Sequence, residues 1–214
     1  MAFLKSLQTV KEETEKKIPK ILNRYMYFQI EQLKRTQLVN QSIRVGNKFP
    51  DSELTLHDGS KTTLFNLIDD KPTILSFYRG SWCPYCNFTL MHFDDLLKLQ
   101  SRPINMVAIS PEKPTENELI SSNPELQFKV TTDEGNQLSK SLGLTFKLPL
   151  MLRIIYRLGG IQLSHSQGNR EHELPVPATY LVDSKGVVIK RWIEVDYKKR
   201  VSPEKVINAY FNYK

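Results

Sequence analysis

Two cysteines, Cys83 and Cys86, are the residues of this chain whose type and spacing are best suited to chemistry. They are its only cysteines, in 214 residues, and they form a Cys-x-x-Cys pair. Such a pair can cycle between a dithiol and a disulfide. An apolar run at 73–77 precedes the pair and a helical pattern at 87–100 follows it, so we expect Cys83 to cap the helix N-terminus. There the unpaired N–H groups and the helix dipole would depress the pKa of Cys83 and make it the reactive thiolate, with Cys86 closing the disulfide.

Two plainer interpretations of the pair are less favoured. Inert core cysteines would not explain the spacing or the strand-to-helix context. A structural zinc ion takes about four ligands, and the chain has no second cysteine pair. Its histidines show no metal-binding spacing; they are His57, His92, His165 and His172. We therefore predict no metal, and the absence of flavin and nucleotide motifs predicts no other cofactor.

Charge and hydropathy narrow the class of protein. The net charge is +7, and the densest cationic cluster combines Lys190-Arg191 with residues 198–200. Without a nucleic-acid motif, we interpret these charges as a solvated surface and predict no nucleic-acid partner. No apolar stretch approaches the roughly 20 residues that span a bilayer, and the N-terminus lacks a signal-peptide core. The prediction is a cytoplasmic protein without a membrane partner, where a dithiol is held reduced and cycles.

Strands alternate with helices beyond residue 42, which predicts an α/β fold of βαβ units around a largely parallel central sheet. A short helix and an exposed loop are expected over 148–174. The strands are expected at 53–57, 61–64, 73–77, 104–109, 127–130, 178–182 and 187–192, and the helices at 64–68, 88–99, 115–122, 136–142 and 203–210.

Residues 1–41 form a predicted helical extension, and 42–214 form the predicted α/β core domain. Apolar residues recur at helical spacing in the extension, and Pro19 marks an expected break between two helices. The apolar stripe must be buried against another surface. Packing on its own domain is favoured, with a homodimer as the alternative.

Three segments carry a resemblance to a known family. They are 45–50 (Val-Gly-Asn-Lys-Phe-Pro), 77–86 (Phe-Tyr-Arg-Gly-Ser-Trp-Cys-Pro-Tyr-Cys) and 176–183 (Val-Pro-Ala-Thr-Tyr-Leu-Val-Asp). Together they resemble peroxiredoxin-like proteins of the alkyl hydroperoxide reductase and thiol-specific antioxidant superfamily. The resemblance covers about residues 42 to 212. It implies a thioredoxin-like fold, with a central mixed sheet flanked by helices, and an antioxidant role in cell redox homeostasis.

The chain departs from the family pattern at the site. Typical peroxiredoxins have a Pro-x3-Thr-x2-Cys motif, in which Cys86 would match the peroxidatic cysteine, Cys83 the threonine and Arg79 the proline. Pro177 stands where peroxiredoxins have an arginine that helps to bind peroxide. Thioredoxins instead have Cys-x-x-Cys and a cis-proline at these two places. The layout thus resembles a peroxiredoxin, whereas the site resembles a thioredoxin.

Thiol–disulfide exchange is the favoured chemistry. In this hypothesis Cys83 attacks a disulfide in a partner protein and Cys86 resolves the mixed disulfide. Pro177, if cis, would lie opposite Cys83 and present backbone groups to an extended substrate. Trp82 would shield the dithiol or contact the partner, and Pro84 and Tyr85, between the cysteines, complete the expected site.

Two alternatives remain open. As a thiol peroxidase, the chain would reduce hydrogen peroxide or alkyl hydroperoxides through a sulfenic acid on Cys86 or Cys83, and Arg79 would lower the thiolate pKa or hold the peroxide. Either enzyme needs an external thiol reductant, of thioredoxin or glutathione type. The third hypothesis is a non-enzymatic, redox-responsive binding module that interacts through the helices of 1–41.

Overall fold

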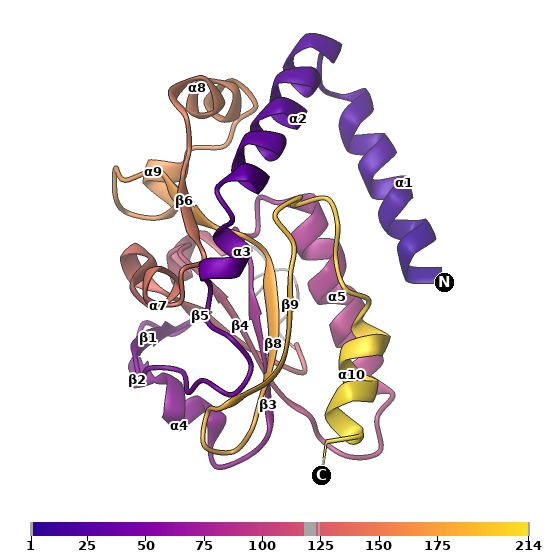
Figure 1. Ribbon diagram of the computed structural model, residues 1–214, viewed down its shortest axis with the longest axis vertical. Helices are drawn as coiled ribbons and strands as arrows, with labels where there is room; N and C mark the ends of the chain where they lie inside the picture. Colours follow the sequence, from indigo (N-terminus) through magenta and orange to yellow (C-terminus); the bar gives the residue numbers. More distant parts are fainter. Residues whose placement is uncertain (1, 118–122, 124, 214) are drawn as a thin grey trace.

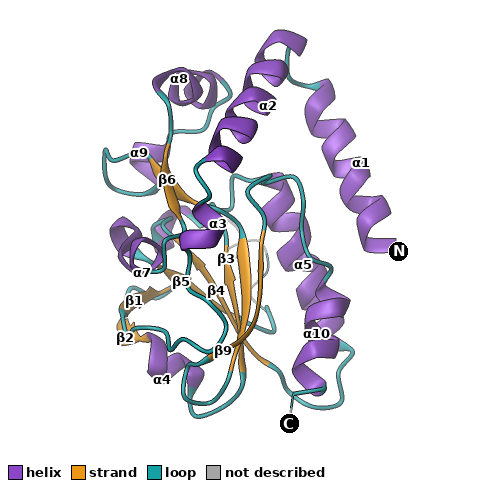
Figure 2. Ribbon diagram, viewed as in Figure 1, coloured by secondary structure: helices purple, strands orange, loops and turns teal. Residues whose placement is uncertain are grey.

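The computed structural model describes residues 2–117, 123 and 125–213. Its described strands form a central sheet in the order β2-β1-β5-β4-β3-β8-β9 (Figure 2). These strands are β1 (Glu53–Leu56), β2 (Lys61–Thr63), β3 (Thr73–Phe77), β4 (Asn105–Ser110), β5 (Lys129–Thr132), β8 (Ala178–Val182) and β9 (Val188–Ile193). A separate antiparallel ribbon pairs β6 (Thr145–Lys147) with β7 (Glu173–Pro175).

Helices cover both faces of the central sheet (Figure 1). They are α1 (Ala2–Lys16), α2 (Lys20–Arg35), α3 (Leu38–Gln41), α4 (Leu64–Ile68), α5 (Pro84–Lys98), α7 (Gln137–Ser141), α8 (Leu150–Leu158), α9 (Leu163–Ser166) and α10 (Pro203–Phe211), with 3-10 turns η1 (Pro114–Glu116) and η2 (Glu134–Asn136). The hairpin of β1 and β2 and the helix α10 with its N-cap Ser202 confirm the sequence predictions. The helix predicted over 115–122 lies largely outside the described residues.

The expectation of a largely parallel sheet is wrong, and the mixed sheet is confirmed. Among the described strands, only β4 pairs in parallel, with β3 and with β5. The outer strands enter through hairpins, which impose antiparallel pairing on β1 with β2 and on β8 with β9. The alternation of strands and helices therefore identified the βαβ centre but not the direction of the strands around it.

Successive side chains of the central strand β3 enter different cores. Ile74 packs with Leu90 of α5 in one buried cluster, whereas Leu75 packs with Leu67 and Leu138 in the other. Side chains alternate between the faces of a strand, so a strand covered by helices on both faces must be apolar throughout. This double burial fixes the end of β3, from which the chain passes directly into the segment that holds the cysteines.

The N-terminal helices pack on the rest of the chain, which is the favoured expectation. Pro19 separates α1 from α2, as predicted, and is the N-cap residue of α2. In α1, Phe3 stacks on Phe88 of α5 at 5.4 Å between ring centroids, and Leu7 is buried in the same core. The division of the chain at residue 42 and the homodimer stay predictions.

The insertion of 148–174 contains more order than the sequence indicated. The expected helix is present as α8, but α9 and the β7 strand follow it in place of an open loop. Because β6 and β7 are three residues each, they are too short to produce a readable alternation of apolar and polar positions.

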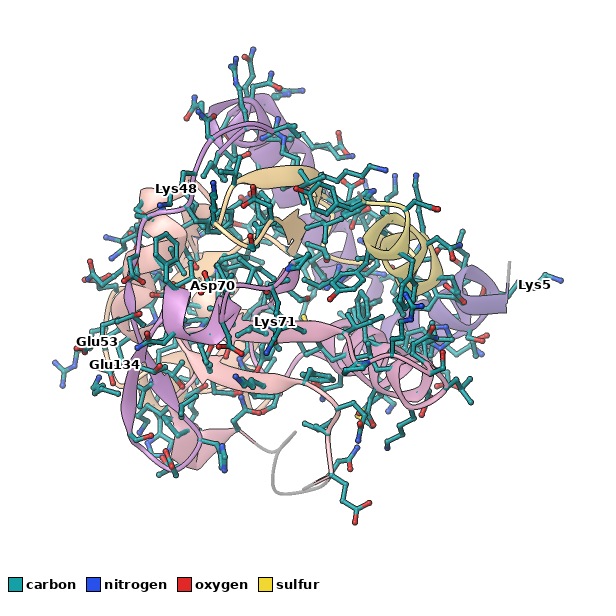
Figure 3. All side chains as sticks on the ribbon, turned by 90° about the horizontal axis from the view of Figure 1, so that it is seen from below. Lys5, Lys48, Glu53, Asp70, Lys71 and Glu134 are labelled. Carbon is teal, nitrogen blue, oxygen red and sulfur yellow. The ribbon has the colours of Figure 1, made fainter. Side chains whose placement is uncertain are left out.

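Charged side chains lie at the edge of the sheet that β2 forms, next to β1. Figure 3 shows Glu53 and Glu134 side by side there, and Lys61 contacts the carboxylates of both at 3.3 and 2.7 Å. Exposed pairs of this kind stabilise by about 0–1 kcal/mol each, but charge on an edge strand discourages pairing with other chains. Within the described residues, no helix has the length and apolarity needed to cross a bilayer.

Two leucines of α1, one buried and one exposed, can test whether this helix is docked on α5. Leu7 is 5% exposed and Leu4 is 54% exposed. We expect Leu7→Ala to destabilise the docked α1 by about 2 kcal/mol, because it leaves a cavity against α5. The matched control Leu4→Ala should stay within about 0.5 kcal/mol. Amide hydrogen exchange over residues 2–16 measures both, and equal protection in the two variants would contradict the docking.

Candidate active site around Cys83 and Cys86

The predicted arrangement of strand, cysteine pair and helix is present. Cys83 is the N-cap residue of α5 and Pro84 begins the helix, where a proline ring costs no backbone hydrogen bond. Pro84 is exposed, while both cysteines are 1% exposed free thiols. The first turn brings them together, with the Cys86 amide donating to the Cys83 carbonyl at 3.0 Å. The dithiol therefore lies just beneath the surface, reached only through the surrounding side chains.

Cys86 is the sulfur that the site stabilises as a thiolate. Its burial opposes ionisation, but the Cys83 thiol donates a hydrogen bond to it, and the charges of Arg200 and Arg79 and the backbone N–H of Arg79 favour the anion. The Arg200 guanidinium lies 3.4 Å from the sulfur. Together these groups lower the pKa of Cys86 to about 5. Cys86 is thus ionised at neutral pH.

The expectation that Cys83 has the depressed pKa is wrong. Burial raises the pKa of the Cys83 thiol, and its hydrogen bond to Cys86 and the negative charge there raise it further. The side chain of Cys83 accepts no capping hydrogen bond from the helix. The helix N-terminus alone therefore does not decide which sulfur ionises; the two nearby guanidinium groups act more strongly on Cys86.

Arg79 is a buried cation enclosed by aromatic rings. It is 3% exposed and is therefore not a surface cation. Its guanidinium carbon lies 4.4 Å from the ring centroid of Tyr197, 4.9 Å from that of Trp82 and 5.5 Å from that of Tyr156, and it donates a hydrogen bond to the Tyr156 hydroxyl. Ring faces attract a desolvated cation. They hold the charge where it lowers the pKa of Cys86, as predicted.

The cationic cluster near the C-terminus is not only a solvated surface, which corrects the sequence interpretation. Arg200 faces Cys86 and donates to the Lys199 carbonyl at 2.7 Å. Lys198 is 5% exposed and its ammonium lies 3.4 Å from the ring centroid of Tyr27, which belongs to α2. Arg191 donates to the carbonyl oxygens of the connector before β1, at Ser42 and Ile43. These cations bind the N-terminal helices and the active site to the C-terminal segment.

The remaining predicted residues surround this centre. Trp82 is half-buried and meets Tyr156 edge to face, at 5.6 Å between ring centroids. Tyr85 is buried and meets Tyr197 in the same way, also at 5.6 Å. Within the described residues no peptide bond is cis, so Pro177 does not have the cis geometry considered for a thioredoxin-like site.

Two cavities reach the site from different sides. The larger, of about 620 Å³, is lined by Cys86, by α1 and by cations that include Arg200. The smaller, of about 300 Å³, is lined by Arg79, α2 and the segment leading into α8. Pro177 lines both cavities. Cys83 lines neither of them, so a molecule entering the larger cavity meets Cys86 first.

Sequence reasoning missed Arg200, Tyr156 and Tyr197 as members of the site. Arg200 was visible as part of a cationic cluster, but its distance along the chain from Cys86 concealed the contact. The two tyrosines carried no motif at all. The described residues contain no grouping of three or more potential metal ligands, and the prediction of no metal stays a prediction.

The sequence of this chain is similar to those of a known protein family. A family model described as "AhpC/TSA family" matches residues 45–191. A chloroplastic peroxiredoxin Q from Populus jackii is 26% identical over 167 residues, which are 78% of this chain and 65% of the relative. The corresponding Triticum aestivum protein is 26% identical over 173 residues, 80% of this chain and 67% of the relative. The chain thus spans about two thirds of the length of these relatives.

Solved structures show the same architecture. The peroxidoxin BcpB of Mycobacterium tuberculosis aligns with a TM-score of 0.60 at 17% identity, over 80% of this chain and 99% of that chain. Reduced Prx3 of Vibrio vulnificus, in complex with H2O2, aligns with a TM-score of 0.61 at 15% identity, over 78% and 99%. The fold is therefore the thioredoxin-like fold of peroxiredoxins.

The ionisation of Cys86 yields a pH prediction. Its thiolate should disappear only as the pH falls through about 5, since protonation removes the charge that the arginines stabilise. Arg200→Gln should raise this pKa, so that the thiolate is lost nearer to neutral pH. Ultraviolet absorbance of the thiolate in a pH titration measures the change. Lys199→Gln, an exposed neighbour, is the matched control, and an equal shift in both variants would refute the role of Arg200.

Proposed function

The chain belongs to the AhpC/TSA family, and from that premise we propose that it is a thiol-dependent peroxidase in which Cys86 attacks the peroxide and Cys83 resolves the product. The ionised state of Cys86 carries this proposal. Of the two cysteines, Cys86 is the one whose pKa is lowered, and it is the one that lines the larger cavity. It also occupies the position that matches the peroxidatic cysteine of the family pattern.

In the first step, the Cys86 thiolate attacks the terminal oxygen of the hydroperoxide. A sulfur–oxygen bond forms, the oxygen–oxygen bond breaks, and the departing alkoxide takes a proton from solvent in the cavity to become an alcohol. Cys86 is left as a sulfenic acid. The positive charges of Arg79 and Arg200 face the sulfur, where they offset the negative charge passing to the leaving oxygen.

In the second step, Cys83 becomes the nucleophile. The negative charge on Cys86 raises the pKa of Cys83, whereas Arg79 and Arg200 lower it. Burial also raises the pKa of Cys83 and continues to do so, but once Cys86 is a neutral sulfenic acid its repulsion is gone, and the attraction of the two arginines is opposed by burial alone. The Cys83 sulfur then attacks Cys86, the sulfur–sulfur bond forms, and hydroxide departs with the Cys83 proton as water. An external thiol reduces the disulfide, and its chemical class is left open.

The sequence favoured a different hypothesis, thiol–disulfide exchange in which Cys83 is the attacking sulfur. The structure supports this hypothesis less well than it supports a peroxidase. Exchange requires the attacking sulfur to be an accessible thiolate. Cys83 is 1% exposed and its pKa is raised. A protein of the same fold, reduced Prx3 of Vibrio vulnificus, has been solved as a complex with H2O2, which supports the peroxide as the oxidant. Pro177 has the trans geometry rather than the cis one that exchange would use.

The decisive experiment mixes the reduced protein with hydrogen peroxide and follows tryptophan fluorescence by stopped flow. We expect oxidation at least about thirtyfold faster than that of free cysteine, since a free thiol with a pKa of about 8.5 is only about 3% ionised at neutral pH whereas Cys86 is almost fully ionised. Cys86→Ser should abolish the reaction. Cys83→Ser should retain the first step and stop at a sulfenic acid that dimedone traps.

The two variants also separate the proposal from its rivals. If Cys83→Ser abolished the peroxide reaction and Cys86→Ser retained it, the assignment of roles would be reversed. If the rate matched that of free cysteine, peroxidase chemistry would be excluded. Turnover of insulin disulfides would then support exchange, and the absence of both activities would support the binding module.

A further inference from the structure

A second cavity, on the side of the site away from the cysteines, has no role in the peroxidase steps. It lies where α2 meets the β6 strand and α8, which are neighbours in Figure 1 and share a buried cluster. Its volume is about 300 Å³. Most of its wall is apolar, with side chains that include Met26, Ile30, Leu33, Phe146, Leu148 and Leu152.

The charges that line this cavity are all positive. Arg79 and Lys147 are its charged residues, and its lining includes no carboxylate. Arg79 is 3% exposed, and within the described part of the chain its Nε finds no hydrogen-bond acceptor. A buried donor without an acceptor destabilises the protein, and more so when it is charged. The cavity therefore combines an apolar wall with a buried cation whose Nε lacks an acceptor.

We propose that this cavity binds a small apolar carboxylic acid, whose carboxylate lies on Arg79 and whose hydrocarbon part fills the space between α2 and α8. The carboxylate supplies the acceptor that Nε lacks, in a geometry that guanidinium groups favour. The hydrocarbon part removes the apolar wall from water. Lys147, which is exposed, adds a second positive charge at the mouth of the cavity.

Binding of the acid is coupled to the redox state of the cysteines, and this coupling rests on the proposed function. In the reduced protein, the charge of the Cys86 thiolate acts on Arg79 and competes with the acid for it. The disulfide is neutral, so the acid gains the full attraction of Arg79 after oxidation. By linkage, an acid that binds the oxidised protein more tightly stabilises the disulfide by the same factor.

Three probes with the same chain length test the site in the full-length protein. Isothermal titration calorimetry compares octanoate, octanol and octylamine. We expect octanoate to bind at one site per chain, at least about tenfold tighter than octanol, because a hydrogen bond between a guanidinium and a carboxylate is about twice as strong as one to a neutral group. Octylamine should not bind, because its positive charge is repelled by Arg79. Octanoate should also bind about tenfold tighter to the disulfide form, which corresponds to a reduction potential lower by about 30 mV.

Two matched variants locate the site. Leu33→Trp fills the cavity and should abolish octanoate binding. Leu99→Trp makes the same change at a residue that is 78% exposed and outside this cavity, and it should leave binding unchanged. Arg79→Gln should remove the preference for octanoate over octanol while octanol still binds. Circular dichroism establishes that each variant is folded.

The double variant Cys83→Ser with Cys86→Ser separates this inference from the proposed function. It has no redox chemistry and no thiolate, so it should bind octanoate as tightly as the disulfide form does, even if the chain proves not to be a peroxidase. Equal affinity for octanoate and octanol in the unmodified protein would overturn the proposal. So would the absence of binding, which would mean that water satisfies Arg79, or binding that survives Leu33→Trp.

Discussion

The attraction between a buried thiolate and two guanidinium groups is the interaction on which the rest of this structure depends. A charge removed from water costs several kcal/mol unless it is paired, and Cys86 is 1% exposed. Its partners come from distant parts of the chain: Arg79 from the loop after β3, and Arg200 from the segment before α10. Each partner is positioned in turn, Arg79 by three aromatic rings and Arg200 by backbone carbonyl oxygens. The fold therefore converges on one sulfur atom, and the Cys-x-x-Cys spacing is only the local part of that arrangement.

The positions of these arginines give the two cysteines different pKa values, which the Cys-x-x-Cys motif by itself does not predict. Helix geometry favours ionisation of the N-cap residue Cys83, whereas the position of the guanidinium groups favours Cys86. The second effect prevails because full charges act at close range in a buried site, while the helix N-terminus carries only about half a charge. In the proposed mechanism, the Cys86 thiolate that helps to suppress ionisation of Cys83 disappears once Cys86 carries oxygen, and the guanidinium groups continue to favour the Cys83 thiolate. One set of arginines thus serves both cysteines in sequence.

The sequence predicted the features that depend on residues close together in the chain. It did not predict those that depend on contacts between distant residues. Local signals located the β1–β2 hairpin, the buried strand β3, the Ser202 cap and the cysteine pair at the start of α5. These depend on neighbouring residues, so periodicity and turn chemistry are enough to find them. The direction of the outer strands, the burial of Lys198 and the contact of Arg200 with Cys86 depend on residues far apart in the chain. A cationic cluster looks the same in sequence whether it is solvated or faces a thiolate.

The N-terminal helices then decide what can reach the dithiol. Both cavities have a wall from the predicted extension, α1 on the side of Cys86 and α2 on the side of Arg79. A small peroxide can enter with the helices in place, but a protein surface needs contact with a sulfur that is 1% exposed. Reduction of the proposed disulfide by a protein thiol would therefore require movement of α1, which is anchored on α5 by Phe3 and Leu7. In the proposed mechanism, oxidation and reduction of the pair thus place different demands on the extension: a small peroxide reaches Cys86 in the closed structure, whereas reduction is limited either to small thiols or by the free energy of undocking one helix.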